Sequence, residues 1–206
     1  MTLLATNLEI AVSCVVRGKI EEAGEFTVPS KLISEYVALL PKERVDVVQE
    51  GTVMTISCGQ YKTKINGTPS SEYPLIPTID VHQSFELDSK SLKDAVSQVL
   101  FAVSSNESRP EISGLLLKFT PGEQLTLTLA ATDSYRLAER IVPATAVGQA
   151  PSEAVSVIVP ARSVAEFVRS FGALKDAIDA PEKVNIGIGD NQVKFSFGPM
   201  ELVSRT

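Results

Sequence analysis

The chain repeats itself, and this internal repeat limits the possible fold more than any single motif does. Three segments of the first half recur in the same order in the second half, so that Thr6 aligns with Thr132 and Pro29 with Pro160. The pairs are ATNLEIAV (5–12) with ATDSYRLAER (131–140), FTVPSKLISEYVALLP (26–41) with VIVPARSVAEFVRSFG (157–172), and VQEGTVMTISCG (48–59) with IGDNQVKFSFG (188–198). Such self-similarity indicates two copies of one unit: a strand pair, a helix begun by proline, and a hairpin.

Local patterns within the copies predict mostly strands and three helices. Short segments rich in β-branched and aromatic residues, separated by turn residues, predict strands; these are residues 8–16, 45–51, 53–59, 115–119, 125–132, 156–160, 183–189 and 193–198. Helical spacing of apolar residues occurs over residues 29–44, 88–104 and 160–175. The clearest apolar stripe is that of residues 88–104, formed by Leu92, Ala95, Val96, Val99, Leu100 and Val103.

The two copies are not equally complete. The second copy begins near Phe85 with a helix and two strands whose counterparts would precede Met1, and the tail TPSSEYPLIP of the first copy has no counterpart before Thr206. We therefore expect a chain cut at both ends, with residues 68–83 as a linker rich in Pro and Ser.

Composition excludes several classes of protein. With 206 residues, of which 44% are hydrophobic, the chain can bury a core. It has no apolar run long enough to cross a bilayer and no signal-peptide pattern, so we expect a cytoplasmic location. Cys14 and Cys58 are too few for a disulfide framework and are expected in the cores of strands. His82 is the single histidine, which leaves no Cys/His cluster for zinc.

Charge is unevenly distributed along the chain. The net charge is −6, which argues against a protein that coats nucleic acid. The three predicted helices nevertheless carry an excess of positive charge, whereas the remainder is strongly acidic. Positive helices inside an acidic shell suit a protein that surrounds phosphates without reading bases. Ordinary solvated helix faces explain the same charges equally well.

Six motifs in order resemble the bacterial DNA polymerase III beta subunit, the sliding clamp. They are ATNLEIAV, FTVPSKL, SEYP, SRPEISGLLLKF, TDSYRLA and VIVPARSVAEFVR, and they span nearly the whole chain. The resemblance implies an α+β fold of repeated DNA-clamp units, each with two helices packed on antiparallel sheets. It assigns residues 1–81 to the latter part of clamp domain one plus the linker, and residues 82–206 to clamp domain two without its final segment. A third domain is expected to be absent.

The resemblance also implies a function. In the family, two protomers close head to tail into a ring around duplex DNA and confer processivity without catalysis or cofactors, and without a membrane. They tether the replicative polymerase, the clamp loader and repair polymerases through a short hydrophobic peptide motif. An alternative is a truncated clamp-related scaffold that binds proteins without encircling DNA. A small hydrolase using Asp133 and Tyr135 is a third reading, although the sequence lacks a complete catalytic set, a phosphate-binding loop and metal-ligand spacing.

The family's peptide groove maps onto the TDSYRLA motif. The matching positions of this wall of the groove are Ile112, Thr132, Ser134, Tyr135, Arg136 and Leu137. Leu137 and Ile112 would form an apolar floor, and Tyr135 and Arg136 are residue types enriched in binding hot spots. A local alternative is that Asp133 and Arg136 only stabilise a turn by an ion pair. Because the other wall comes from segments beyond this chain, we predict half a groove and weak peptide binding.

Two further surfaces follow from the resemblance. The residues expected to face DNA are Asn106, Arg109, Lys90, Lys93, Arg162 and Arg169. Pairing of Arg109 with Glu107 or Glu111 is the local alternative. The strand over residues 60–66 is expected to pair with a neighbouring protomer through an edge that carries Tyr61, Thr63 and Ile65 on one face. Packing on a local core explains that alternation equally well.

Overall fold

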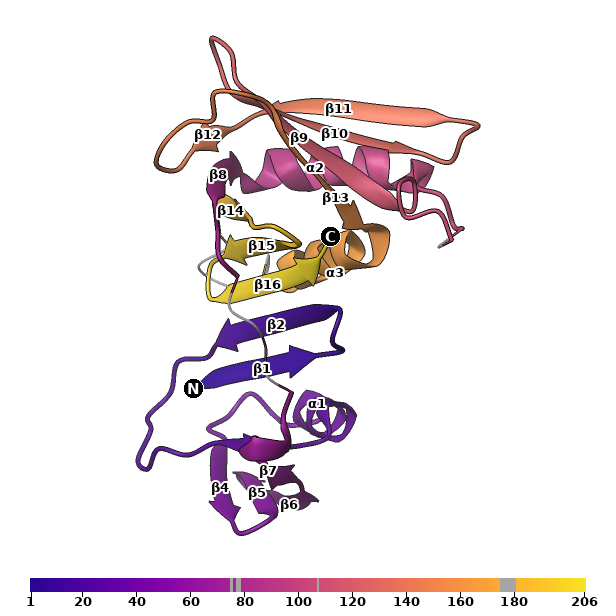
Figure 1. The fold of residues 1–206 in the computed structure, drawn as a ribbon. Coiled ribbons are helices and arrows are strands. Elements are labelled where there is room, and N and C mark those ends of the chain that lie inside the picture. The colour runs from indigo at the N-terminus through magenta and orange to yellow at the C-terminus, as the bar shows by residue number, and fades with distance from the viewer. Residues whose placement is uncertain (75, 77–78, 107, 175–180) are drawn as a thin grey trace. The chain divides into compact units, whose positions relative to one another are not determined.

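The computed structural model describes residues 1–74, 76, 79–106, 108–174 and 181–206. The chain divides into two compact units (Figure 1). Unit one comprises Met1 and Arg17–Leu75, and unit two comprises Thr2–Val16 and Ile76–Thr206. The described residues form three α-helices and short strands in antiparallel sheets, so the predicted α+β class is confirmed.

Unit one consists of one helix beside small antiparallel sheets. Its elements are β3 (Phe26–Thr27), α1 (Ser30–Ala38), β4 (Asp46–Glu50), β5 (Val53–Cys58), β6 (Tyr61–Asn66), β7 (Thr68–Pro69) and a 3-10 turn, η1 (Ser70–Glu72). The strands β4, β5 and β6 form one sheet in that order, and β3 pairs with β7. The sheet order leaves β6 at an edge, which is where the sequence predicts an edge strand.

The first helix is shorter than the sequence predicts. The predicted range of residues 29–44 is wrong at its C-terminal end, because α1 ends at Ala38. Pro41 explains the difference, since proline disfavours helical geometry in the residue before it and has no N–H to continue the helix. Lys42 and Arg44 therefore lie outside the helix, and Arg44 pairs with Asp46 at 2.7 Å.

Unit two contains two sheets. The seven-stranded sheet has the order β1-β2-β16-β15-β14-β8-β12 and the four-stranded sheet has the order β11-β10-β9-β13. Their bounds are β1 (Thr2–Thr6), β2 (Ile10–Val15), β8 (Gln83–Asp88), β9 (Gly114–Thr120), β10 (Thr126–Thr132), β11 (Leu137–Pro143), β12 (Thr145–Ala146), β13 (Val155–Pro160), β14 (Lys183–Ile188), β15 (Gln192–Phe197) and β16 (Met200–Arg205).

The N-terminal hairpin of β1 and β2 belongs to this second unit. Backbone pairing joins β2 to β16, with Ile10 opposite Ser204 and Cys14 opposite Met200. The sequence predicts the same hairpin as part of the first copy, because local pattern cannot tell which sheet edge a hairpin will extend. Both cysteines are free thiols in strands, as expected. Cys58 in β5 is buried, as expected for a core residue, whereas Cys14 in β2 is only half-buried.

Two helices and two sheets enclose the core of unit two. The helix α2 (Ser89–Val99) continues into a 3-10 turn, η2 (Leu100–Ala102), and contacts β10 and β11; α3 (Ala161–Leu174) contacts β9 and β13 (Figure 1). The predicted helix over residues 160–175 is confirmed as far as Leu174, because Lys175 lies outside the described residues. The predicted helix over residues 88–104 is confirmed in its main part but ends too late, because helical structure stops at Ala102 and Val103 is extended. No helix in the described ranges is long and apolar enough to cross a membrane.

Aromatic side chains tie these layers together. Phe85 of β8 stacks on Phe119 of β9, with 3.7 Å between ring centroids, and so links the two sheets. Phe167 of α3 packs against Phe195 and Phe197 of β15, with centroid distances of 4.8 and 5.2 Å. The first contact joins the two sheets and the second anchors α3 to the seven-stranded sheet, so that the core is closely packed.

Candidate functional site

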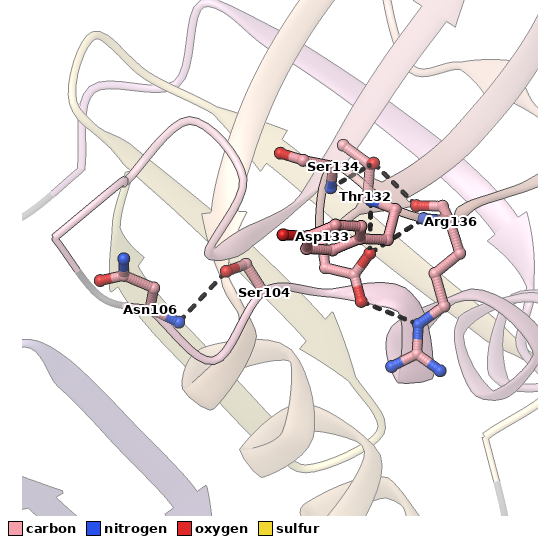
Figure 2. A network of polar contacts seen from close by, with 7 residues as sticks. Ser104, Asn106, Thr132, Asp133, Ser134 and Arg136 are labelled. Atoms are coloured by element: carbon pink, nitrogen blue, oxygen red, sulfur yellow. Dashed lines mark hydrogen bonds and ion pairs between the residues drawn. The ribbon is translucent and has the colours of Figure 1, made fainter.

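The TDSYRLA motif forms the turn between β10 and β11, and its threonine organises the backbone. The Thr132 hydroxyl donates to the carbonyl of Arg136 at 2.7 Å and accepts from the N–H of Ser134 at 3.1 Å (Figure 2). The N–H of Asp133 donates to the Arg136 carbonyl at 3.3 Å. The four turn residues are therefore held in one geometry although all of them lie at the surface.

Asp133 uses both of its carboxylate oxygens inside the turn. Its Oδ1 accepts from the backbone N–H groups of Tyr135 and Arg136, each at 3.0 Å, and its Oδ2 accepts from Arg136 Nε at 2.9 Å (Figure 2). The two backbone bonds hold the pKa of the Asp133 carboxyl below its usual value, and the Arg136 charge adds to the effect. A carboxylate engaged in this way is a poor general base, which argues against the hydrolase reading.

The first copy of the repeat contains the same turn. Thr6 Oγ1 donates to the carbonyl of Ile10 at 2.9 Å and accepts from the N–H of Leu8 at 3.0 Å. Asn7 Oδ1 accepts from the N–H groups of Glu9 and Ile10, at 3.0 and 2.8 Å. Each bond has its counterpart in the second copy, so the network of threonine and Asp or Asn is a property of the fold.

Even the unusual backbone conformation is common to both copies. Ser134 has a φ of 77° and Leu8 a φ of 75°, in the left-handed region that non-glycine residues seldom adopt. Because both turns carry this conformation, it belongs to the turn itself. Functional differences between the copies must therefore come from the side chains that the turn displays.

The displayed side chains differ sharply between the copies. Tyr135 is 98% exposed and Leu137 is 70% exposed, beside the exposed guanidinium of Arg136. The position of Arg136 is occupied in the first copy by Ile10, which is 8% exposed and belongs to the core. A flat phenol, a guanidinium and an apolar side chain together on a rigid turn form a surface suited to binding a peptide.

Phe101 adds an aromatic ring to this surface. It is not among the site residues that the sequence predicts. The guanidinium carbon of Arg136 lies 5.4 Å from the centroid of the Phe101 ring, within the range of a cation–π contact. Phe101 is on η2, and it is absent from the apolar stripe of residues 88–104. Its position outside the apolar face of an amphipathic helix is the sequence signal that could have identified Phe101 as an exposed aromatic residue.

Arg109 connects the loop between η2 and β9 to the turn. Its Nε donates to Glu111 Oε1 at 3.1 Å and its Nη1 lies 3.4 Å from Ser134 Oγ. Two hydrogen bonds lower the pKa of the Glu111 carboxyl: the larger effect comes from the backbone N–H of Glu111, and the smaller from the side chain of Arg109. The predicted local pairing with Glu111 is present, whereas Glu107 lies outside the described residues. This DNA-facing candidate thus sits beside a peptide-groove candidate.

Asn106 and Ile112 shape the same loop through hydrogen bonds. Asn106 accepts at Oδ1 from the N–H of Ser108 at 3.0 Å, and its own N–H donates to Ser104 Oγ at 3.1 Å (Figure 2). The half-buried Ile112 closes the loop, because its carbonyl accepts from the N–H of Ser104 at 3.0 Å. In the described part of the chain, Ile112 forms no hydrogen bond to the turn.

The four cationic candidates on the helices differ in how far they are neutralised. On α3, Arg169 Nε donates to Glu166 Oε2 at 3.0 Å, and Arg162 lies 3.9 Å from Glu9. On α2, Lys90 and Lys93 form no ion pair with any described residue. The two lysines are therefore the cations of this set that are most available to a phosphate.

The three residues of β6 that are predicted to meet a neighbouring protomer differ in how far they are buried. Along β6, Tyr61 is exposed, Thr63 is half-buried and Ile65 is only 6% exposed. Ile65 therefore packs within unit one, as the alternative of a local core predicts for that position. Of the three predicted residues, Tyr61 is the most accessible to a partner.

The single histidine, His82, takes part in a pair at the surface. His82 Nε2 lies 3.0 Å from Asp190 Oδ1 in an exposed pair that joins the start of β8 to the turn after β14. Within the described ranges, no three side chains of His, Cys, Asp or Glu come together as a metal site.

Comparisons with known proteins agree on one family. The model of the central domain of the DNA polymerase III beta subunit matches residues 86–206, and the model of its N-terminal domain matches residues 1–77. A beta sliding clamp of Halalkalibacterium halodurans is 31% identical over 91% of this chain and 47% of its own length. The chain spans about half the length of the curated relatives that it matches.

Solved structures give the same result. The DNA polymerase sliding clamp of Bacillus subtilis superposes with a TM-score of 0.84 at 28% identity, covering 99% of this chain and 53% of that chain. A sliding clamp of Bartonella birtlesii, crystallised with griselimycin, superposes with a TM-score of 0.84 at 27% identity and with the same coverage.

Proposed function

The chain belongs to the DNA polymerase III beta subunit family, and on this premise we propose that it is part of a sliding clamp that confers processivity on a replicative polymerase. In this proposal the intact protein is a cytoplasmic, head-to-tail homodimer that encircles duplex DNA without reading its sequence. It acts by tethering other proteins and catalyses no reaction itself. The repeated unit supports this role, because a ring is built by repeating one unit around an axis.

We further propose that the surface of Tyr135, Arg136 and Leu137 receives the partner peptide. One observation carries this proposal: the two copies share the turn down to its individual hydrogen bonds, yet only the second copy displays these three exposed side chains. A turn that is fixed before binding reduces the entropy lost on association. Polymerase, clamp loader and repair polymerases would compete for the same surface.

Griselimycin is a suitable probe, because it is bound to the related clamp of Bartonella birtlesii. We expect it to shift the NMR signals of residues 133–137 in the ¹⁵N-labelled chain, weakly but in a saturable manner. Arg136→Ala and Leu137→Ala should each weaken binding by at least about fivefold, the loss of roughly 1 kcal/mol or more that marks an interface residue of consequence.

Arg140→Ala is the matched control for this titration. Arg140 is exposed on the same strand, β11, but three residues beyond the proposed surface. The assignment is contradicted if the shifts map elsewhere, or if Arg140→Ala weakens binding as much as the two test variants. Binding as tight as that of a full-length clamp would contradict the prediction that this chain carries half a groove.

A further inference from the structure

Phe101 is an aromatic residue whose side chain faces solvent where its neighbours face the core. In η2, Ala102 is fully buried and Leu100 packs against the core, whereas Phe101 is 61% exposed. A single exposed apolar residue needs no explanation by itself. Here, however, the ring lies against one particular group, the guanidinium of Arg136.

Arg136 is held from two directions. Asp133 Oδ2 accepts from its Nε at 2.9 Å along the edge of the guanidinium, and the Phe101 ring lies 5.4 Å from its central carbon. Asp133 cannot turn away, because its Oδ1 is fixed by two backbone N–H groups. Within the described residues, Nη1 and Nη2 of Arg136 donate to no protein group, so four N–H donors remain for a ligand.

The arrangement is specific to the second copy of the repeat. The first copy keeps the same turn but has Asn7 and Ile10 where the second has Asp133 and Arg136. Neither an ion pair nor a cation–π contact can form there. The fold therefore does not require the contact between Arg136 and Phe101. The contact is instead attributed to the binding of a ligand at the second turn.

We propose that Phe101 is a positioning residue of the partner-binding surface, and that it holds the Arg136 guanidinium in the orientation that receives the partner peptide. This inference rests on the proposed function of the turn. Without the ring, one face of the guanidinium would be free, and Arg136 would sample rotamers that direct its Nη groups away from the turn. Ordering a long side chain before binding lowers the entropic cost of association.

Phe101→Leu and Phe101→Tyr test the inference in the full 206-residue chain. Leucine keeps an apolar side chain but removes the π face, whereas tyrosine keeps the ring and can place its hydroxyl in water. The first readout is the Nε–H signal of Arg136, assigned by its disappearance in Arg136→Ala. We expect a ring-current shift in the wild type and in Phe101→Tyr, and its loss in Phe101→Leu. If the Phe101 ring does not lie against Arg136 in solution, Phe101→Leu will leave this signal unchanged.

The second readout is griselimycin affinity. Phe101→Leu should weaken binding about two- to fivefold, as expected for loss of an exposed cation–π contact, and Phe101→Tyr should restore it. An Arg136 signal that is insensitive to Phe101→Leu overturns the inference. A signal that changes while the affinity does not also overturns it, because the contact would then have no role in binding.

The two proposals fail in different ways. If the turn does not bind partners, griselimycin leaves the wild-type signals of residues 133–137 unshifted, while the ligand-free Arg136 signal still responds to Phe101→Leu. That result overturns both the proposed surface and the partner role of Phe101. If only the inference about Phe101 is wrong, the wild-type chain binds griselimycin at the turn, and Phe101→Leu and Phe101→Tyr bind it as tightly as the wild type.

Discussion

At the scale of single residues, Asp133 combines a structural task with a functional one. Its Oδ1 supports the backbone of the turn, as Asn7 Oδ1 does in the first copy, and its Oδ2 holds Arg136. The repeat thus provides an internal control: an amide at this position is known to support the turn. The two tasks can be separated by substitution.

Asp133→Asn should leave the unfolding temperature unchanged and weaken griselimycin binding, because the amide keeps the backbone bonds but loses the ion pair. Asp133→Ala should lower the unfolding temperature and weaken binding, since it loses both. Thermal unfolding followed by circular dichroism, with the same NMR titration, measures the two effects. Equal destabilisation by both substitutions would show that the ion pair, and not the backbone bonds, supports the turn.

At the scale of elements, α2 matters most to the site, because it ends at η2 and so positions Phe101. The helix begins at an N-cap, Asp88, whose Oδ1 accepts from the N–H of Ser91 at 2.8 Å. Hydrogen bonds from the side chain and the backbone of Ser91 lower the pKa of the Asp88 carboxyl. The apolar face of α2, with Leu92, Val96 and Val99, is buried in the core.

Asp88→Ala should reduce the free energy of unfolding at pH 7 by about 1 kcal/mol, the usual loss for an N-cap. Asp88→Asn, which retains a capping oxygen, should cost less. Urea unfolding followed by circular dichroism at several pH values measures both. Equal losses in the two variants would mean that charge rather than capping sets the contribution.

The pH dependence of this cap follows from the lowered pKa. Because the pKa of Asp88 is lower in the folded chain than in the unfolded chain, its carboxylate stabilises the fold at pH values above the unfolded pKa of about 3.8. This stabilisation disappears as the pH falls through the lower pKa of the folded state. The wild type should therefore lose stability relative to Asp88→Asn as the pH drops below about 3.8. A difference between the two proteins that stays constant from pH 7 to pH 3 would contradict this expectation.

At the scale of the whole molecule, the charges on the helices of unit two bear on the proposed encounter with DNA. Lys90 and Lys93 are free of ion pairs among the described residues, whereas Arg169 is bound to Glu166, which raises the pKa of Arg169 further above its usual value. A guanidinium that must first release a carboxylate gains less from a phosphate. We therefore expect Arg169 to contribute less to the attraction to DNA than Lys90 or Lys93.

Replacing both Lys90 and Lys93 by alanine should weaken binding of a labelled duplex at low salt. It should also reduce the slope of log affinity against log salt by about 1 to 2, since each phosphate contact contributes roughly 0.9. Arg169→Ala should change the slope less. Fluorescence anisotropy across a salt series measures these effects, with Lys118→Ala on the exposed surface of β9 as the control. An equal effect of Lys118→Ala would show that the attraction is not localised on α2.

Local pattern along the chain is enough to predict several features of this protein. The repeat predicts two copies of one turn, the apolar stripe predicts α2, and the order of motifs identifies the family, because each of these depends on residues close together in the chain. Tertiary structure alone decided what distant segments do to one another. It placed the hairpin of β1 and β2 beside β16 and set the ring of Phe101 against the guanidinium of Arg136. The physical reason is that side-chain contacts and sheet edges are chosen by packing across the core, where spacing along the chain no longer constrains which groups meet.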